Sequence, residues 1–161
     1  MASGLHIRAA VAADAGLILH FIRELAIYEK AESSVLTDEA GIRASLFAAN
    51  ATAQALLCER DGQAIGFAVY FHNYSTWLGR NGIYLEDLYV SPEHRGCGAG
   101  KALLQHIARL AVEQGCGRLE WSVLDWNTPA IEFYKAAGAK PQDEWTVYRL
   151  QGEALRRFAE G

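Results

Sequence analysis

The chain has 161 residues, of which 51% are hydrophobic and 21% charged, and its formal net charge is −4. This composition is typical of a folded globular protein and excludes disordered and fibrous classes. A net negative charge argues against nucleic-acid binding and favours a small cationic partner.

The cysteines and the first residues of the chain indicate the cellular compartment of the protein. Cys58, Cys97 and Cys116 are odd in number and lack CxxC or metal-ligand spacing, so free thiols in a reducing compartment are expected. The opening "MASGLHIRAA" has no basic region followed by an apolar core, and no apolar run is long enough to span a bilayer. We therefore expect a cytoplasmic protein without a membrane partner.

The first third of the chain predicts one strand and two helices. The apolar run 5–11 suits a strand, whereas 13–28 suits a helix because its apolar residues recur at spacings of four and three. Thr37 is expected to cap a second helix, with Asp38 and Glu39 in its first turn.

Three strand-like runs follow, at 52–60, 63–73 and 82–90. The first two are joined by Asp61-Gly62, a dipeptide that favours a tight hairpin turn. These runs predict an antiparallel meander.

Beyond residue 90, helix and strand signals alternate. Helices are predicted at 98–114, after Asn127 and at 152–160, and strands at 118–124 and 144–150. Two strands joined through a helix run parallel. The sequence thus predicts a single α/β domain over residues 1–161, with a mixed, mostly antiparallel sheet flanked by helices.

The segment "RGCGAGK", at 95–101, lies between a strand and a helix and suggests phosphate binding. A Walker loop would need glycine at Arg95 and Ser or Thr at Ala102, and a dinucleotide fingerprint would need glycine at Lys101. The pattern [RQ]xxGx[GA] is filled, by Arg95, Gly98 and Gly100. A strand-to-helix turn without a ligand is the alternative.

This loop resembles the acyl-CoA pyrophosphate loop of the Gcn5-related N-acetyltransferases, and "DWNTPAIEFYKAAGA" resembles their second signature. The segments "IRELAIYEK", "STWLGR", "IYLEDLYV", "LDWN" and "QGEAL" resemble the diamine acetyltransferase branch, and the resemblance covers nearly the whole chain, from about Ile7 to Leu155. The turn at Asp61-Gly62 and the segment from Lys140 to Trp145 look shorter than in that branch, which places the rim of the substrate pocket in question.

The resemblance implies that acetyl-CoA is the co-substrate and that no metal is needed. Loop amides would face the pyrophosphate, and the backbone of the preceding strand would pair with the pantetheine arm. Lys101 could instead be a solvated lysine, and Cys97 suits a small filler better than an acyl-enzyme nucleophile, because no adjacent base is evident. The expected cofactor-binding residues are Leu88, Tyr89, Val90, Arg95, Gly96, Cys97, Gly98, Ala99, Gly100, Lys101, Asn127, Ala130 and Tyr134.

Acetyl transfer to an amine needs a base and an acid. By resemblance, Glu86 is the base, acting through a water molecule, Asp87 binds the cationic amine, and Tyr134 is the acid. Strand alternation places Glu86 and Asp87 on opposite faces unless a bulge intervenes. A solvated strand residue is the alternative for Glu86, and a core tyrosine is the alternative for Tyr134.

The resemblance also implies that Tyr28, Glu29 and Glu144 contact the substrate, although each could be an ordinary surface residue. The expected function is acetylation of a small primary amine, a diamine, polyamine or lysine analogue, by direct attack within a ternary complex. The alternatives are acetylation of protein, peptide or antibiotic amines, and a non-catalytic acyl-CoA-binding module. By resemblance the protein is expected to form a homodimer.

Overall fold

The computed structural model describes residues 4–161. The chain divides into two compact units, the first ending at Ser122 and the second beginning at Val123.

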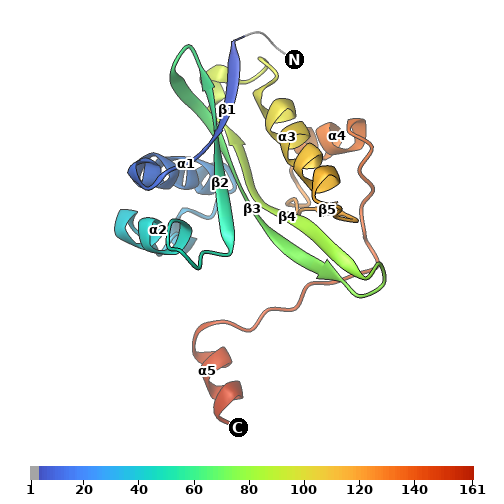
Figure 1. Ribbon diagram of the computed structural model, residues 1–161. Helices are drawn as coiled ribbons and strands as arrows, with labels where there is room; N and C mark the ends of the chain where they lie inside the picture. Colours follow the sequence, from blue (N-terminus) through green and yellow to red (C-terminus); the bar gives the residue numbers. More distant parts are fainter. Residues whose placement is uncertain (1–3) are drawn as a thin grey trace. The chain divides into compact units, whose positions relative to one another are not determined.

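The first unit contains a five-stranded sheet with the strand order β1-β2-β3-β4-β5 (Figure 1). Neighbouring strands from β1 to β4 are antiparallel, whereas β4 and β5, which are connected through α3, are parallel. The predicted mixed sheet is therefore confirmed. The strands are β1 (Leu5–Ala9), β2 (Ala53–Arg60), β3 (Gln63–Ser75), β4 (Arg80–Val90) and β5 (Leu119–Glu120).

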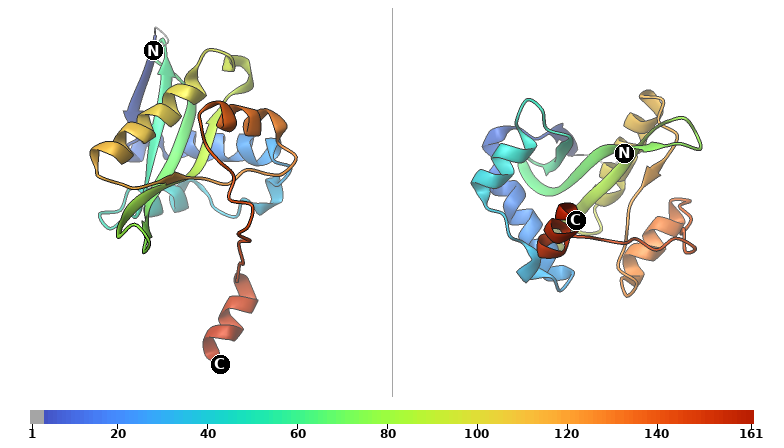
Figure 2. Two further views of the ribbon diagram at one scale, coloured as in Figure 1. Left: turned by 90° about the vertical axis from the view of Figure 1, so that its right-hand side faces the viewer. Right: turned by 90° about the horizontal axis from the view of Figure 1, so that it is seen from below.

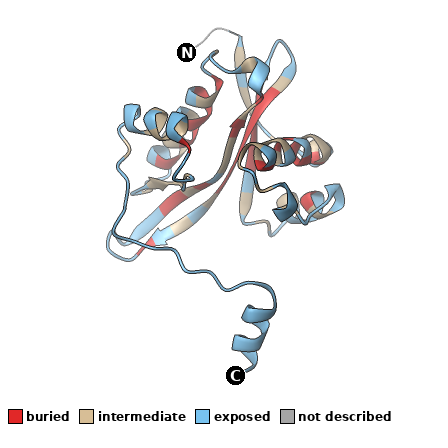
Figure 3. Cartoon of the chain, turned by 180° about the vertical axis from the view of Figure 1, so that it is seen from behind, coloured by how far each residue is buried: buried red, intermediate tan, exposed pale blue. Residues whose placement is uncertain are grey.

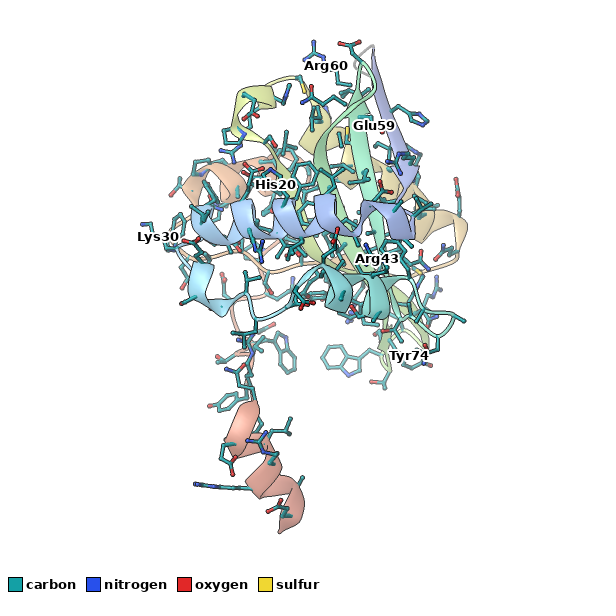
Figure 4. All side chains as sticks on the ribbon, turned by 90° about the vertical axis from the view of Figure 1, so that its left-hand side faces the viewer. His20, Lys30, Arg43, Glu59, Arg60 and Tyr74 are labelled. Atoms are coloured by element: carbon teal, nitrogen blue, oxygen red, sulfur yellow. The ribbon has the colours of Figure 1, made fainter. Side chains whose placement is uncertain are left out.

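Helices cover both faces of this sheet. Figures 1 and 2 show α1 (Ala15–Tyr28) and α2 (Glu39–Leu46) on one face and α3 (Ala99–Glu113) on the other. Figure 4 looks onto the α1 and α2 side, where Arg43 lies on α2 and Lys30 marks the end of α1. Because the sheet is covered on both faces, its central strand β3 is buried continuously from 65 to 70, as the apolar run predicts.

The core between α1, α2 and the sheet contains three aromatic residues. The ring of Phe21 stacks on Phe67 with centroids 5.5 Å apart, and its centroid lies 6.4 Å from that of Tyr89. Figure 3 shows the buried residues on the strands and on the inward sides of the helices. Burial of rings of this size contributes several kcal/mol to stability, in the range of about 3–5 kcal/mol per Phe→Ala substitution.

The turn between β2 and β3 confirms the hairpin prediction. Asp61 and Gly62 both have positive φ angles, 52° and 78°. This is the backbone geometry of a two-residue turn that matches the twist of the strands, and Asp-Gly adopts it readily.

The cap of α2 corrects one prediction. Asp38, not Thr37, is the N-cap: its backbone is extended and its Oδ1 accepts a hydrogen bond from the Gly41 amide at 2.8 Å. The Thr37 hydroxyl instead lies 3.4 Å from the Asp38 carbonyl oxygen. Asp38 prevails because its carboxylate reaches the third helical amide and favours the positive end of the helix dipole.

The predicted strand at 118–124 is shorter than expected. Only Leu119 and Glu120 pair with β4, opposite Ile83 and Tyr84. Two residues after Tyr84, at Glu86, β4 contains a bulge against β3. A bulge bends its strand and disrupts pairing, so β5 does not follow β4 further.

The second unit contains α4 (Thr128–Ala136) and α5 (Gly152–Glu160), both of which were predicted. The predicted strand at 144–150 is wrong: this segment is irregular and exposed, and no strand lies in the described part of this unit. A strand pattern alone does not form a strand, because extended backbone needs a neighbour for its hydrogen bonds. Across residues 4–161, no helix is both long and apolar enough to cross a membrane.

Candidate functional site

The glycine loop joins β4 to α3 in the first unit. A short 3-10 helix, Pro92–His94, precedes it, and Gly98 is the N-cap of α3 with no side-chain cap. The first intrahelical bond runs from the Ala102 amide to the Gly98 carbonyl, at 2.9 Å. The earlier amides of this 15-residue helix therefore have no carbonyl partner within it. Together with the helix dipole they form a backbone surface suited to a phosphate.

The three loop glycines are needed for different reasons. Gly96 and Gly98 have φ angles of 85° and 87°, a region that other residues enter at a cost. Gly100, by contrast, lies in α3, and a methyl group there would meet only Val90 Cγ2, at 3.9 Å. The fold itself thus accommodates alanine at position 100, and a helical glycine is less stable than alanine. A ligand that approaches the backbone closely would account for glycine at this position.

Gly100→Ala should therefore separate stability from ligand binding. We expect the free energy of unfolding to rise by about 0.5–1 kcal/mol, while the Kd for CoA rises at least tenfold. Urea unfolding and calorimetric titration with CoA measure the two quantities. Gly98→Ala is the contrasting variant. Because Gly98 has a left-handed backbone, alanine at this position should lower the free energy of unfolding and also raise the Kd for CoA. Unchanged CoA affinity in Gly100→Ala would remove the pyrophosphate assignment from this loop.

The β4 strand that enters the loop has one open edge. Its pairing with β3 continues to Val90, but its pairing with β5 stops at Tyr84. Within the first unit, the edge of β4 beyond Tyr84 has no strand partner on the β5 side. This segment includes Leu88 to Val90, so an extended ligand such as a pantetheine arm could add to it like a strand.

Glu86 is the bulged residue of β4. Asp87 pairs with Val69 and Leu85 with Tyr70, so Glu86 is the extra residue between them. Asp87 shares the face of Val69, which packs in the core under α1 and α2, whereas Glu86 is exposed. Two adjacent carboxylates in an apolar strand are the sequence signal that could have predicted this bulge.

Three carboxylates gather at this point of the first unit. Burial, together with the nearby charges of Glu86 and Glu29, raises the pKa of Asp87 to about 6. Burial also raises the pKa of Glu29, which follows α1 directly. A cationic amine bound here would compensate the repulsion, because opposite charges favour the ionised form of both partners.

The raised pKa of Asp87 predicts a pH-dependent gain of stability in Asp87→Asn. Its folded-state pKa, about 6, exceeds the ordinary value of 3.8, so wild-type stability falls as the pH rises through this interval. The shift corresponds to about 3 kcal/mol at most, and for a half-buried group we expect about 1–2 kcal/mol. Urea unfolding should show this gain at pH 7.5 and a smaller one at pH 4.5.

The exposed Asp125 provides the control, since Asp125→Asn should change stability little at either pH. A gain in Asp87→Asn that is equal at both pH values would contradict the assignment of charge repulsion to Asp87.

The Arg95 side chain lies between two tyrosines. Its guanidinium carbon is 5.2 Å from the ring centre of Tyr28 and 5.6 Å from that of Tyr89. Its Nε also donates a hydrogen bond to the Val90 carbonyl, at 3.1 Å. The sequence reasoning did not foresee this arrangement, because the three residues come from α1, β4 and the loop and share no local pattern.

The remaining loop residues differ in how far they are exposed to solvent. Lys101 is exposed in the first turn of α3, and Ala99 is buried. Cys97 is partly exposed and has a free thiol. Among residues 4–161, no group of three or more His, Cys, Asp or Glu side chains is arranged to hold a metal ion.

The second unit carries the other predicted site residues. Asn127 is buried and is the N-cap of α4, where its Oδ1 accepts a hydrogen bond from the Ala130 amide at 3.4 Å. Tyr134 is half-buried on α4, with its ring centroid 5.5 Å from that of Phe133. Glu144 is exposed in the irregular segment. The cap and the helix were predicted, and they hold the Tyr134 side chain on an ordered element.

Comparison with known proteins identifies the family. Residues 21–139 match the Acetyltransferase (GNAT) family. The chain belongs to this family. It is 42% identical to a thialysine N-epsilon-acetyltransferase of Bos taurus over 164 residues, which cover 95% of this chain and 96% of the relative. This GNAT protein thus belongs to the diamine acetyltransferase branch and is an acetyltransferase.

The chain is also similar to a plant enzyme and to a solved structure. An L-ornithine N5-acetyltransferase of Arabidopsis thaliana is 45% identical over 91 residues, which cover 56% of this chain and 40% of the relative. The solved structure of an integron cassette protein from the mobile metagenome of V. cholerae superposes with a TM-score of 0.82 and 26% identity, covering 98% of this chain and 99% of that one. The GNAT protein therefore shares its fold over nearly its whole length with a solved structure.

Proposed function

We propose that this GNAT protein transfers the acetyl group of acetyl-CoA to the terminal primary amine of a small amino acid of the thialysine or ornithine type. The observation that carries the proposal is the group of three carboxylates, Glu29, Glu86 and Asp87, on and beside the strand that enters the glycine loop. The carboxylates suit the cationic amine, and the neighbouring backbone anion site suits the negatively charged acetyl-CoA.

The chain's residues fit acetyl-CoA. The uncapped start of α3 and the glycine at 100 suit the pyrophosphate, and the open edge of β4 suits the pantetheine arm. Arg95 and Lys101 add positive charge. When bound, acetyl-CoA supplies the activated acetyl group.

The proposed chemistry removes two protons from the substrate ammonium and supplies one to the leaving thiolate. Glu86 accepts the first proton through a water molecule, which leaves a neutral nitrogen. As the new N–C bond forms and the thioester C–S bond breaks, Tyr134 donates its phenolic proton to the departing thiolate. The second proton leaves the nitrogen as the amide forms and returns through solvent to the Tyr134 phenolate, which restores the acid. Asp87 and Glu29 hold the cationic substrate, with Tyr28 and Glu144 beside it.

The substrate class rests on the relatives. Thialysine and ornithine, named in two of them, are amino acids with a primary amine at the end of the side chain. Thiol release from acetyl-CoA should be measured with thialysine, ornithine, lysine, spermidine and an aminoglycoside. We expect kcat/KM for the best amino acid to exceed that for spermidine. Turnover confined to the aminoglycoside would overturn the substrate class.

We also propose that residues 1–161 form a single N-acetyltransferase domain and that the protein is a cytoplasmic homodimer. Free thiols at Cys58, Cys97 and Cys116 support a reducing compartment. Exposed apolar side chains in the second unit, including Trp145, Val147 and Phe158 at 65%, 82% and 77% exposure, support association with a second copy. Sedimentation equilibrium measures the assembly.

A further inference from the structure

Arg95 connects two parts of the first unit that serve different reactants. The residue belongs to the glycine loop, but its guanidinium group lies over the ring of Tyr28, the last residue of α1. The next residue, Glu29, is one of the carboxylates that raise the pKa of Asp87. The side chain of Arg95 thus reaches from the proposed pyrophosphate site to the wall of the proposed amine site.

The contact is held on several sides. The second ring, Tyr89, is 6% exposed and belongs to the core, so it is a fixed platform for the guanidinium group. The Val90 carbonyl accepts a hydrogen bond from Nε. Burial raises the pKa of Tyr89, the charges of Glu24 and Glu93 raise it as well, and Arg95 lowers it, so the arginine and both carboxylates act on the same ring. A planar guanidinium group stacks on rings in a way that lysine does not reproduce.

We propose that Arg95 is a positioning residue that transmits the binding of acetyl-CoA at the glycine loop to the amine site through Tyr28. When the loop amides hold the pyrophosphate, the loop backbone is fixed and so is the position of Arg95. The guanidinium group then restrains Tyr28 and the end of α1 that carries Glu29. By linkage, the amine in turn strengthens binding of the cofactor by the same factor.

The proposal rests on the proposed function for its ligands, but its first test needs neither an amine nor turnover. Amide hydrogen exchange reports the opening of the end of α1, where the Glu29, Lys30 and Ala31 amides bond to carbonyls of that helix. Saturating CoA should slow exchange in this segment about fivefold in the wild type. In Arg95→Lys at saturating CoA, the slowing should disappear.

Arg109→Lys is the matched control, because Arg109 is exposed ten residues into α3. It should retain the slowing. Slowing that persists in Arg95→Lys, or that is absent in CoA-bound wild type, would overturn the proposal. If wild type binds no CoA, the cofactor assignment and this proposal both fail, whereas CoA binding without amine turnover refutes the proposed function alone.

The second test uses kinetics with the best amine. Arg95→Lys should raise the KM for the amine about fivefold with kcat within twofold of wild type. In a Tyr28→Ala background, the same substitution should change that KM less than twofold, because its route through the ring is gone. An equal rise in both backgrounds, or a rise confined to the KM for acetyl-CoA, would make Arg95 a phosphate ligand only.

Discussion

Tyr134→Phe should reduce kcat by about 100-fold or more, the range that a positioned general acid contributes. The substitution keeps the ring that lies beside Phe133 on α4 and removes only the hydroxyl proton. An ordinary phenol titrates about 1.5 pH units above a thiol, so donation to a thiolate is uphill by only about 2 kcal/mol. Initial rates of thiol release at saturating substrates measure the loss.

The control for this variant is Tyr148→Phe, in which the same hydroxyl is lost from a side chain that is 93% exposed in the same unit. Its kcat should match the wild type. A wild-type kcat in Tyr134→Phe would make Tyr134 a packing residue, which is the alternative that its helical position allows.

Glu86→Gln should reduce kcat/KM about 100-fold at pH 7 and progressively less as the pH rises. An alkyl ammonium with a pKa near 10.4 loses its proton at pH 7 at a cost of about 4.6 kcal/mol, and a base helps to remove that proton. The neutral fraction of the amine grows about tenfold per pH unit up to its pKa, so the need for Glu86 declines. Profiles of kcat/KM from pH 6.5 to 9.5 test this.

The matched control is Glu113→Gln, on the exposed last residue of α3, which should leave the profile unchanged. A constant ratio between wild type and Glu86→Gln at all pH values would assign Glu86 to substrate binding rather than to proton removal.

Local sequence signals account for much of the fold. Periodicity predicted α1 and α3, Asp61-Gly62 predicted the hairpin, and Asn127 with Gly138 predicted the limits of α4. Each of these features depends on residues close together in the chain. The spacing of Arg95, Gly98 and Gly100 likewise suggested a phosphate loop, because the pattern is contained in one turn.

Features that depend on distant residues could not be read in the same way. The strand pattern at 144–150 has no partner strand in its own unit, and the pairing of β5 with β4 ends two residues before the bulge at Glu86. The stacking of Arg95 on Tyr28 joins residues that are 67 positions apart. The raised pKa of Asp87 depends on burial under α1 as well as on the charge of the neighbouring carboxylate. Composition alone therefore did not indicate it.

The central claim is direct transfer of acetyl from acetyl-CoA to an amine while both are bound. Initial velocities should be measured over a matrix of acetyl-CoA and amine concentrations, with thialysine as the first amine. Direct transfer predicts double-reciprocal lines that intersect. Parallel lines, which are typical of a covalent acetyl-enzyme such as one formed on Cys97, would contradict direct transfer.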